Sequence, residues 1–231
     1  DGLEMVSKAP EHVAIIPDGN RRWAEKNGLS TKEGHKEGYE NLKRVADLAF
    51  SKGAKYLTAY TFSTENWSRA EDEVGYLMKM ASWVVKEEAG EYHKKGIRLR
   101  FLGSREGLEP TLVEGLKAAE ELTQNNTNGT ICICFNYGGR RDVVDAVNRM
   151  LESGLNSVDE DSFSNWLSTH GVPDPDLVIR TSGEHRLSNF LVWESAYSEM
   201  YFADCLWPDF NENELNKAIE DYNQRQRRFG A

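Results

Sequence analysis

The chain has 231 residues, and at about 150 residues per domain this length predicts one large domain rather than two. Hydrophobic residues make up 39% of the chain, which excludes a disordered or fibrous protein. The 28 Lys and Arg residues against 38 Asp and Glu residues leave a formal net charge of -10. This charge opposes a broad nucleic-acid surface and restricts any basic site to a local patch.

No apolar run approaches the ~18 residues that a membrane span needs, and no basic-then-apolar leader opens the chain. We therefore expect a cytoplasmic protein with no transmembrane span and no nucleic-acid partner. Cys132 and Cys134 alternate within the apolar run Ile131 to Phe135, and the three cysteines fit neither a disulfide framework nor a CxxC site. They are interpreted as strand-filling residues in a reducing compartment.

Apolar runs alternate with amphipathic segments, which is typical of a single, mostly parallel α/β sheet flanked by helices. Strands are predicted at His12 to Ile16, Tyr56 to Phe62, Ile97 to Leu102, Thr130 to Asn136 and Leu177 to Arg180. Helices are predicted at His35 to Lys52, Glu71 to Lys95, Pro110 to Gln124, Arg141 to Glu152 and Glu212 to Arg227. The segment Glu71 to Lys95 is predicted to be the longest helix.

No connector is long enough to separate domains, so residues 12–231 are expected to form one domain. Residues 1–11 are expected to form an N-terminal tail, in which Asp1 to Glu4 are interpreted as a remnant ahead of Met5.

Ligands in open α/β sheets bind outside the carboxyl ends of the strands, and polar segments follow three of the predicted strands. The first strand is followed by Asp18, Gly19, Asn20, Arg21 and Arg22. Glycine permits close backbone approach, N–H groups at a helix start favour phosphate, and paired arginines match its charge. Taken alone, Asp18 and Asn20 are equally well explained as residues that only cap a helix. Capping does not, however, account for the two arginines.

The second strand is followed by Ser63 to Arg69, where hydroxyls, a carboxylate, an amide, an indole and a guanidinium fall within seven residues. An ordinary loop with Ser68 as the cap of the next helix explains Ser68 and Glu71 but leaves Trp67 and Arg69 without a role. We therefore favour a binding function for this loop.

The fifth strand leads into Arg180 to Phe190, whose arginines, hydroxyls and glycine suit a diphosphate cradle because guanidinium groups bind phosphate bidentately. A solvated loop is the alternative, and a lone His185 is more typical of a surface or packed histidine. Glu199 stands among aromatic residues, either as a buried carboxylate that needs a partner or as a metal ligand. Together with Asp18 it would be able to hold Mg²⁺.

Several other chemistries lack their motifs in this chain. It has no GxxxxGK[ST] loop, no GxGxxG, no HExxH and no DDxxD pattern, and Arg180 stands where a GxSxG elbow needs glycine. The residues themselves therefore predict a Mg²⁺-assisted diphosphate site on an α/β sheet.

The polar segments resemble the motifs of the cis-prenyltransferases, and they occur in the order of that family. The overall likeness, which runs from about His12 to the C-terminus, is to the bacterial undecaprenyl diphosphate synthases. The matching segments are Asp18 to Ala24, Gly34-His35, Phe62 to Trp67, Asn136 to Arg140, Arg180 to Phe190, Trp207 to Phe210 and Arg227 to Gly230.

The resemblance implies repeated cis condensation of isopentenyl diphosphate onto an allylic diphosphate such as farnesyl diphosphate. It also implies Mg²⁺, a homodimer, and undecaprenyl diphosphate made for a cell-wall lipid carrier. The hydrocarbon product needs an apolar tunnel and, on release, contact with a membrane surface. The predicted long helix would line this tunnel with Val74, Leu77, Met78, Ala81 and Val85, together with Ile131 and Ile133, although ordinary core packing explains each residue singly.

The resemblance also assigns roles to residues at matching positions. Asp18 would position Mg²⁺ on the allylic diphosphate, and Asn66 would assist proton removal. Glu199 matches a metal-binding glutamate, and His185 a less certain metal ligand. Gly19, Asn20, Arg21, Arg22, Trp23 and His35 would hold the allylic substrate. Arg180, Arg186, Leu187 and Ser188 would hold isopentenyl diphosphate, with Ser63, Thr64, Glu65, Trp67 and Arg69 between the two substrates.

Two positions depart from the family pattern. Arg21 replaces a frequent glycine, and Thr31 followed by Lys32 stands where many members have arginine. Because lysine is a point charge rather than a bidentate fork, primer affinity or primer choice is expected to differ.

Two alternatives use the same residues. A catalytically silent subunit of the Nogo-B receptor type is disfavoured because Asp18, Asn66, Arg180, Arg186 and Glu199 are all present. A Mg²⁺-dependent phosphate-ester hydrolase built on Asp18 leaves Trp67 and the apolar stripe unexplained.

Overall fold

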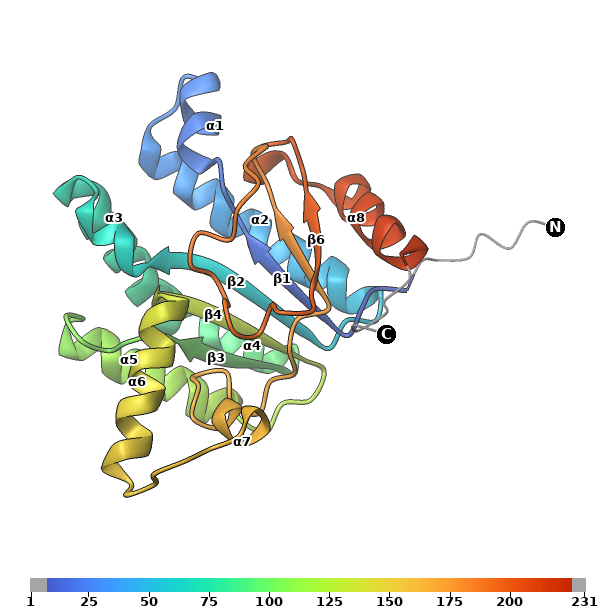
Figure 1. Cartoon of the computed structure of the whole chain (residues 1–231). Coiled ribbons are helices and arrows are strands. Elements are labelled where there is room, and N and C mark those ends of the chain that lie inside the picture. Colours follow the sequence, from blue (N-terminus) through green and yellow to red (C-terminus); the bar gives the residue numbers. More distant parts are fainter. Residues whose placement is uncertain (1–7, 226–231) are drawn as a thin grey trace.

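The computed structural model describes residues 8–225, and within them six parallel strands form one sheet. The order across the sheet is β3-β4-β2-β1-β5-β6 (Figure 1). The strands are β1 (His12–Ile16), β2 (Tyr56–Ser63), β3 (Ile97–Leu102), β4 (Gly129–Tyr137), β5 (Leu177–Arg180) and β6 (Glu199–Phe202). The predicted parallel α/β architecture is therefore confirmed.

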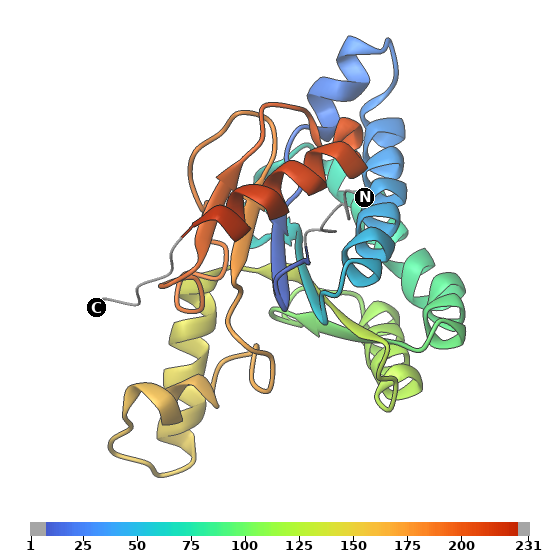
Figure 2. The same cartoon turned by 90° about the vertical axis from the view of Figure 1, so that its right-hand side faces the viewer.

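Helices cover both faces of this sheet (Figure 2). They are α1 (Asn20–Lys26), α2 (Thr31–Ser51), α3 (Glu71–Trp83), α4 (Ala89–Lys94), α5 (Pro110–Thr123), α6 (Gly139–Glu152), α7 (Glu160–Ser164) and α8 (Glu212–Gln224), with 3-10 turns at Thr64–Ser68 and Trp207–Asp209. Among these described helices, none is both long and apolar enough to cross a membrane.

Alternate residues of the central strand enter two different cores, because successive side chains of a strand point to opposite faces. Val13 and Ile15 join the larger core beneath α2, α3, α5 and α8. Ala14 and Ile16 join a smaller core with Phe190 and Leu191. Cys132 and Cys134 are free and fully buried in this second core, which agrees with their interpretation as strand filling.

The predicted helix over Glu71 to Lys95 is helical throughout most of its length, but it is not a regular α-helix. A π-helical turn at Val84–Glu88 separates α3 from α4, and α2, with 21 residues, is the longest α-helix among the described residues. The sequence reading also missed β6 and α7. The predicted last helix to Arg227, and the segment Arg227 to Gly230, extend outside the described residues.

Candidate active site

A cavity of about 930 Å³ opens at the carboxyl edge of the sheet, on the face covered by α2, α3 and α5. Its mouth is polar and is formed by residues that follow β1, β2 and β5. These three strands are neighbours, with β1 between the other two. The segments in which the sequence predicted a site therefore meet at one edge of the sheet.

Asp18 and Arg180 form the centre of this mouth. Arg180 is buried, and its Nη2 lies 3.0 Å from Oδ2 of Asp18. The other guanidinium nitrogen, Nη1, donates to the Ser188 hydroxyl at 2.7 Å and to the Arg186 carbonyl at 2.6 Å. The Asp18 backbone is also fixed, because its carbonyl accepts from the Thr181 hydroxyl at 2.6 Å and from the Trp207 amide at 3.0 Å. A charged pair of fixed geometry thus stands where β1 and β5 end.

Helix α1 begins directly at the cavity, and its cap is Gly19, with a φ of 115° and no side-chain cap. The interpretation of Asp18 and Asn20 as helix caps is therefore wrong. Instead, Asn20 packs on α2 at Gly34 and Gly38, where an added Cβ would overlap with Asn20 atoms. The buried Oδ1 of Asn20 has no hydrogen-bond partner among the described residues.

Hydrogen bonds within the loop after β2, and from this loop to the loop after β5, hold it in place. Asn66 accepts from the Ser63 amide at 3.1 Å and so closes the 3-10 turn that begins at Thr64. Glu65 accepts from Asn189 at 3.0 Å, which joins this loop to the loop after β5. Ser68 donates to the Glu65 carbonyl and does not cap α3, whose N-cap is Ala70.

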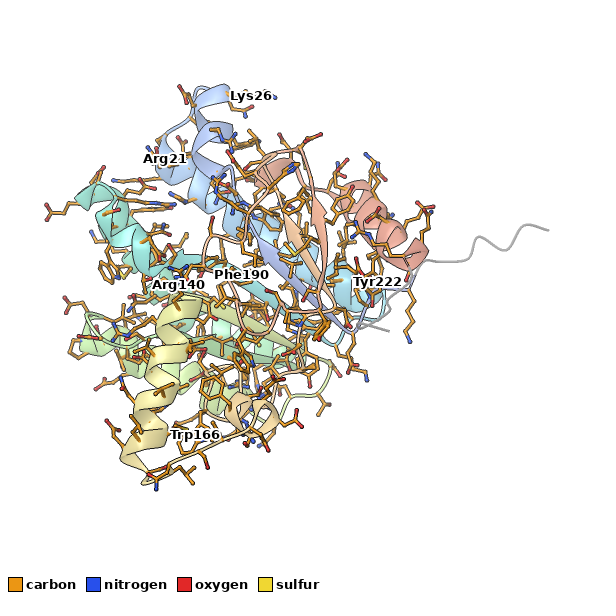
Figure 3. The ribbon with its side chains drawn as sticks, viewed as in Figure 1. Arg21, Lys26, Arg140, Trp166, Phe190 and Tyr222 are labelled. Carbon is orange, nitrogen blue, oxygen red and sulfur yellow. The ribbon has the colours of Figure 1, made fainter. Side chains whose placement is uncertain are left out.

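A buried carboxylate that sequence reasoning missed, Glu73, connects three elements around the mouth. Its Oε1 lies 2.9 Å from Nε2 of His35 and 3.1 Å from Nη1 of Arg69, and its Oε2 lies 3.8 Å from Nη1 of Arg21. Arg21 belongs to α1 (Figure 3), and His35 belongs to α2. Burial lowers the pKa of His35 despite this partner, which keeps the imidazole neutral and donating to Glu73.

The structure separates the predicted residues into two groups. The cavity is lined by Asp18, Gly19, Asn20, Arg21, Arg22, His35, Ser63, Glu65, Asn66, Arg69, Arg180 and Ser188. It is not lined by Trp23, Thr64, Trp67, His185, Arg186, Leu187 or Glu199. Trp23 instead donates to Asp209 and Trp67 to Asn136, so both indoles brace loops.

Asp18 and Glu199 were expected to hold one metal ion together, but within this chain they do not lie side by side. Glu199 begins β6 opposite Leu177, at the amino end of β5, whereas Asp18 follows the carboxyl end of β1. Glu199 is also paired with Arg225 at 2.8 Å. His185 is exposed and stacks on Phe202, with ring centroids 4.6 Å apart. The strand register therefore places the two carboxylates at opposite edges of the sheet.

The remaining donor set fits a diphosphate-bound Mg²⁺ better than a protein cage. No cluster of three or more His, Cys, Asp or Glu side chains suited to a metal occurs within residues 8–225. Mg²⁺ commonly uses one or two carboxylates, several waters and substrate phosphates. Asp18 at the mouth provides such a carboxylate. Within the described part of the chain, Nε of Arg180 and Oδ1 of Asn20 are buried and have no hydrogen-bond partner, which is expected where a polar ligand completes the site.

The inner part of the cavity is apolar and lies against the larger core. Its apolar walls are Leu42 of α2, Leu77, Met80 and Ala81 of α3, Val84 and Val85 of the π turn, and Phe101, Leu116, Ile133 and Phe135. Of the residues proposed for a tunnel, Leu77, Ala81, Val85 and Ile133 line the cavity. Val74, Met78 and Ile131 pack in the core instead.

This fold and site define an α/β protein whose cavity has a charged mouth at the edge of a parallel sheet and an apolar interior. The chain belongs to a prenyltransferase family whose description is "Putative undecaprenyl diphosphate synthase", and the match covers residues 16–230. It is a prenyl transferase.

Individual relatives agree with this family. An isoprenyl transferase of Fusobacterium nucleatum is 50% identical over 227 residues, 98% of each chain. An isoprenyl transferase of Thermotoga maritima is 46% identical, with 97% of this chain and 98% of the relative covered.

Solved structures are similar as well. Lavandulyl diphosphate synthase from Lavandula x intermedia, in complex with dimethylallyl diphosphate, matches with a TM-score of 0.91 and 35% identity, over 99% of this chain and 100% of the other. A probable undecaprenyl diphosphate synthase from Campylobacter jejuni matches with a TM-score of 0.81 and 28% identity, over 96% and 98%.

Proposed function

We propose that the protein condenses isopentenyl diphosphate repeatedly, in cis, onto an allylic diphosphate such as farnesyl diphosphate. The observation that carries this proposal is the continuity of one cavity, from an arginine-rich mouth at Asp18 and Arg180 to an apolar interior at Leu77 and Phe135. A substrate with a diphosphate head and a hydrocarbon tail is likewise charged at one end and apolar at the other.

The reaction breaks the allylic carbon–oxygen bond, forms a carbon–carbon bond to the isopentenyl double bond, and releases diphosphate and a proton. Charge builds on the leaving diphosphate while the allylic carbon becomes cationic. Arg22 and the start of α1 supply fixed positive charge and N–H groups to that diphosphate. Asp18 would hold Mg²⁺ at this position, and the bound ion would supply further neutralisation of the leaving group.

Arg180, which donates to Ser188, would hold the second diphosphate at the neighbouring strand end. Asn66 is a poor base because an amide has no basic lone pair at neutral pH. Its Oδ1 is also engaged by Ser63. We infer that Asn66 orients the loop, a water molecule or a phosphate oxygen, and that phosphate or water accepts the proton.

The apolar interior would receive the growing chain, and undecaprenyl diphosphate for a cell-wall lipid carrier is the proposed product. A homodimer, cytoplasmic placement and transient contact with a membrane surface during product release belong to the same proposal. Arg186, Leu187, His185 and Glu199 would act at the rim or across a subunit contact rather than inside the described cavity.

The test incubates the purified protein with labelled isopentenyl diphosphate, farnesyl diphosphate and Mg²⁺, with a chelated control. We expect a ladder of extended products that needs both primer and Mg²⁺. The substitution Asp18→Ala should reduce extension by about 10³-fold or more, because it removes the carboxylate at the reacting head group. The matched variant Asp161→Ala, which alters an exposed residue of α7, should extend normally.

Other outcomes identify the competing functions. Release of inorganic phosphate without chain extension would indicate a phosphate-ester hydrolase. No extension of farnesyl, geranyl or geranylgeranyl diphosphate by the wild type would contradict the proposal and indicate a silent partner subunit.

A further inference from the structure

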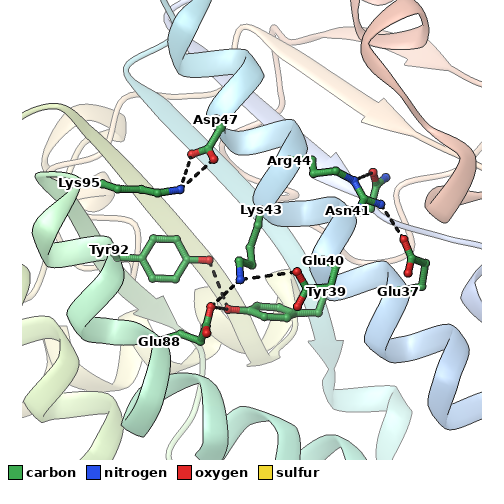
Figure 4. Close-up of polar contacts among 10 residues, drawn as sticks. All are labelled: Glu37, Tyr39, Glu40, Asn41, Lys43, Arg44, Asp47, Glu88, Tyr92 and Lys95. Carbon is green, nitrogen blue, oxygen red and sulfur yellow. Dashed lines mark hydrogen bonds and ion pairs between the residues drawn. The ribbon is translucent and has the colours of Figure 1, made fainter.

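A group of polar side chains joins α2 to the π turn and to α4 (Figure 4). Nζ of Lys43 lies 2.7 Å from Oε2 of Glu88, and the Tyr39 hydroxyl donates to the same oxygen at 3.3 Å. The hydroxyls of Tyr39 and Tyr92 are 3.4 Å apart. We call Tyr39, Lys43, Glu88 and Tyr92 the α2–α4 clamp.

The clamp adjoins the apolar part of the cavity wall. Tyr39 itself lines the cavity, as does Leu42 next to Lys43 in α2. On the other side, Val84 and Val85 line the cavity from the same π turn that contains Glu88. Each half of the clamp is therefore within one helical turn of a wall residue.

Partial burial makes these contacts stronger than ordinary surface pairs. The Glu88 side chain is 15% exposed and that of Lys43 is 29% exposed. Burial raises the pKa of the Tyr39 hydroxyl, so it stays protonated and donates. The Lys43 ammonium also lies 5.5 Å from the centre of the Tyr39 ring, where the ring attracts a cation.

The wall held by the clamp is the irregular part of the long helix. A π turn widens the helix by one residue and commonly occurs at functional sites. At such a turn the regular i to i−4 hydrogen-bond ladder is interrupted, so a contact from outside the helix helps to keep the turn in one position. Glu88, the last residue of the turn, provides this contact to α2.

We propose that the α2–α4 clamp determines product length by holding the Val84–Val85 wall closed against the growing hydrocarbon chain. This inference rests on the proposed chain-elongating function. Growth stops when a further five-carbon unit has to overpack a fixed wall. Without the clamp, the turn moves outward, the apolar cavity deepens, and elongation continues further.

A second ion pair between the same helices provides a matched control. Lys95 and Asp47 are 2.9 Å apart, but both side chains are about half exposed, and neither lines the cavity. Exposed pairs of this kind contribute little to holding two elements together. Removing it should therefore leave the wall in place.

The experiment measures two quantities for each variant: the rate of the first condensation on farnesyl diphosphate and the distribution of final chain lengths. For Glu88→Gln and Tyr39→Phe we expect the main product to lengthen by about one or more five-carbon units. For Glu88→Gln the first-condensation rate should stay within about twofold of wild type, because Glu88 does not line the cavity and the head-group residues are untouched. Lys95→Met should change neither quantity.

The remaining outcomes separate the two proposals. An unchanged or shorter product from both Glu88→Gln and Tyr39→Phe, with a normal first condensation by Glu88→Gln, would overturn the clamp while leaving the elongating function intact. An equal change in Lys95→Met would also overturn it. Absence of any extension by the wild type would remove the elongating function itself. Because Tyr39→Phe deletes a single hydroxyl, it keeps the test valid if Glu88→Gln unfolds, which circular dichroism would show.

Discussion

At the scale of single residues, Glu73 is the group on which the polar mouth depends. Its carboxylate accepts hydrogen bonds from His35 and Arg69 and lies near Arg21. One carboxylate therefore interacts with side chains from three different elements. The side chain of Glu73 is only 9% exposed. Little water surrounds the Glu73 carboxylate, so its charge is only weakly screened. Removing this carboxylate leaves Arg69 without the partner of its ion pair.

The substitution Glu73→Gln tests this role. We expect kcat/KM for the allylic primer to fall about 10-fold or more, since the neutral amide no longer fixes the orientations of Arg69 and His35. Steady-state kinetics with varied farnesyl diphosphate checks the value. Glu71→Gln, an exposed change in the same helical turn, serves as the control, and an equal loss in both variants would contradict the assignment.

The sequence predicted some of these residues and could not predict others. Asp18 and Arg180 stand directly after apolar strands, so local pattern was enough to place them at the sheet edge. In the sequence, Glu73 looks like any acidic residue near the start of a helix, where such residues are favourable. Its burial depends on a contact with His35, which is 38 residues away in the chain. The family resemblance implies that Trp23 and Trp67 contact the substrates, but the indoles donate to Asp209 and Asn136, which are far away in the sequence.

At the scale of elements, the crossing of α1 over α2 decides where the allylic head group would bind. Asn20 occupies the space above Gly34 and Gly38, so the two helices approach more closely than side chains would permit. Trp207 fixes the same region, since its indole donates to the Gly38 carbonyl at 2.8 Å. The position of Arg21 and Arg22 thus follows from two missing Cβ atoms in α2.

The substitution Gly38→Ala should separate the two helices. We expect a loss of about 1 to 3 kcal/mol in the free energy of unfolding, from overpacking against Asn20, and a higher KM for the primer. Gly90→Ala, where an added Cβ meets no atom within 4 Å, should instead gain about 0.5 to 1 kcal/mol because alanine favours a helix. Thermal and urea unfolding of the two variants measure this contrast, and equal effects would disprove it.

The irregular long helix was partly visible in the sequence. Apolar positions Leu77, Ala81, Val85 and Ala89 recur every four residues. At 3.6 residues per turn, each step of this spacing drifts by ~40° around a regular α-helix, and a wider turn corrects the drift. Strand β6 carried no comparable signal, because its residues at the sheet edge are all partly exposed and show no alternation.

At the scale of the whole molecule, the order of the strands creates the site. The sequence predicted five of the six strands within two residues of their ends, but not their neighbours in the sheet. Only the order β2-β1-β5 places the three polar loops side by side. Strand order depends on contacts between residues far apart in the chain, which a local pattern does not contain.

His12 ties this central region together at the opposite edge of the sheet. Its Nδ1 lies 2.6 Å from the Pro173 carbonyl and therefore donates, while its Nε2 accepts from the Thr58 hydroxyl at 2.7 Å. The backbone amide of His12 donates to Asp176 at 3.0 Å. The ring thus joins β1 to β2 and to the segment before β5, and both ring nitrogens are satisfied in the neutral form.

This arrangement predicts a loss of stability in mild acid. Burial lowers the pKa of His12 from 6.5 to about 4, although Asp176 and the Pro173 carbonyl oppose the shift. Between these values the unfolded chain binds the proton and the folded chain does not, so stability is complete above pH 6.5 and declines as pH falls toward 4. At 1.36 kcal/mol per pKa unit, the loss from this residue is about 2 to 3 kcal/mol by pH 4.5.

Urea unfolding of the wild type and of His12→Gln at pH 7 and pH 4.5 measures the effect. The comparison with a variant is needed because burial raises the pKa of Asp142 and Glu194, and those carboxyls add stability toward acid with the opposite sign. Since both proteins contain them, the difference between the two pH slopes isolates His12. His12→Gln should have a lower free energy of unfolding than the wild type at pH 7, and this free energy should fall less between pH 7 and pH 4.5. The control His93→Gln changes an exposed residue, so its free energy of unfolding should have the same pH dependence as that of the wild type. Parallel slopes for wild type and His12→Gln would show that the buried imidazole is not the group that titrates.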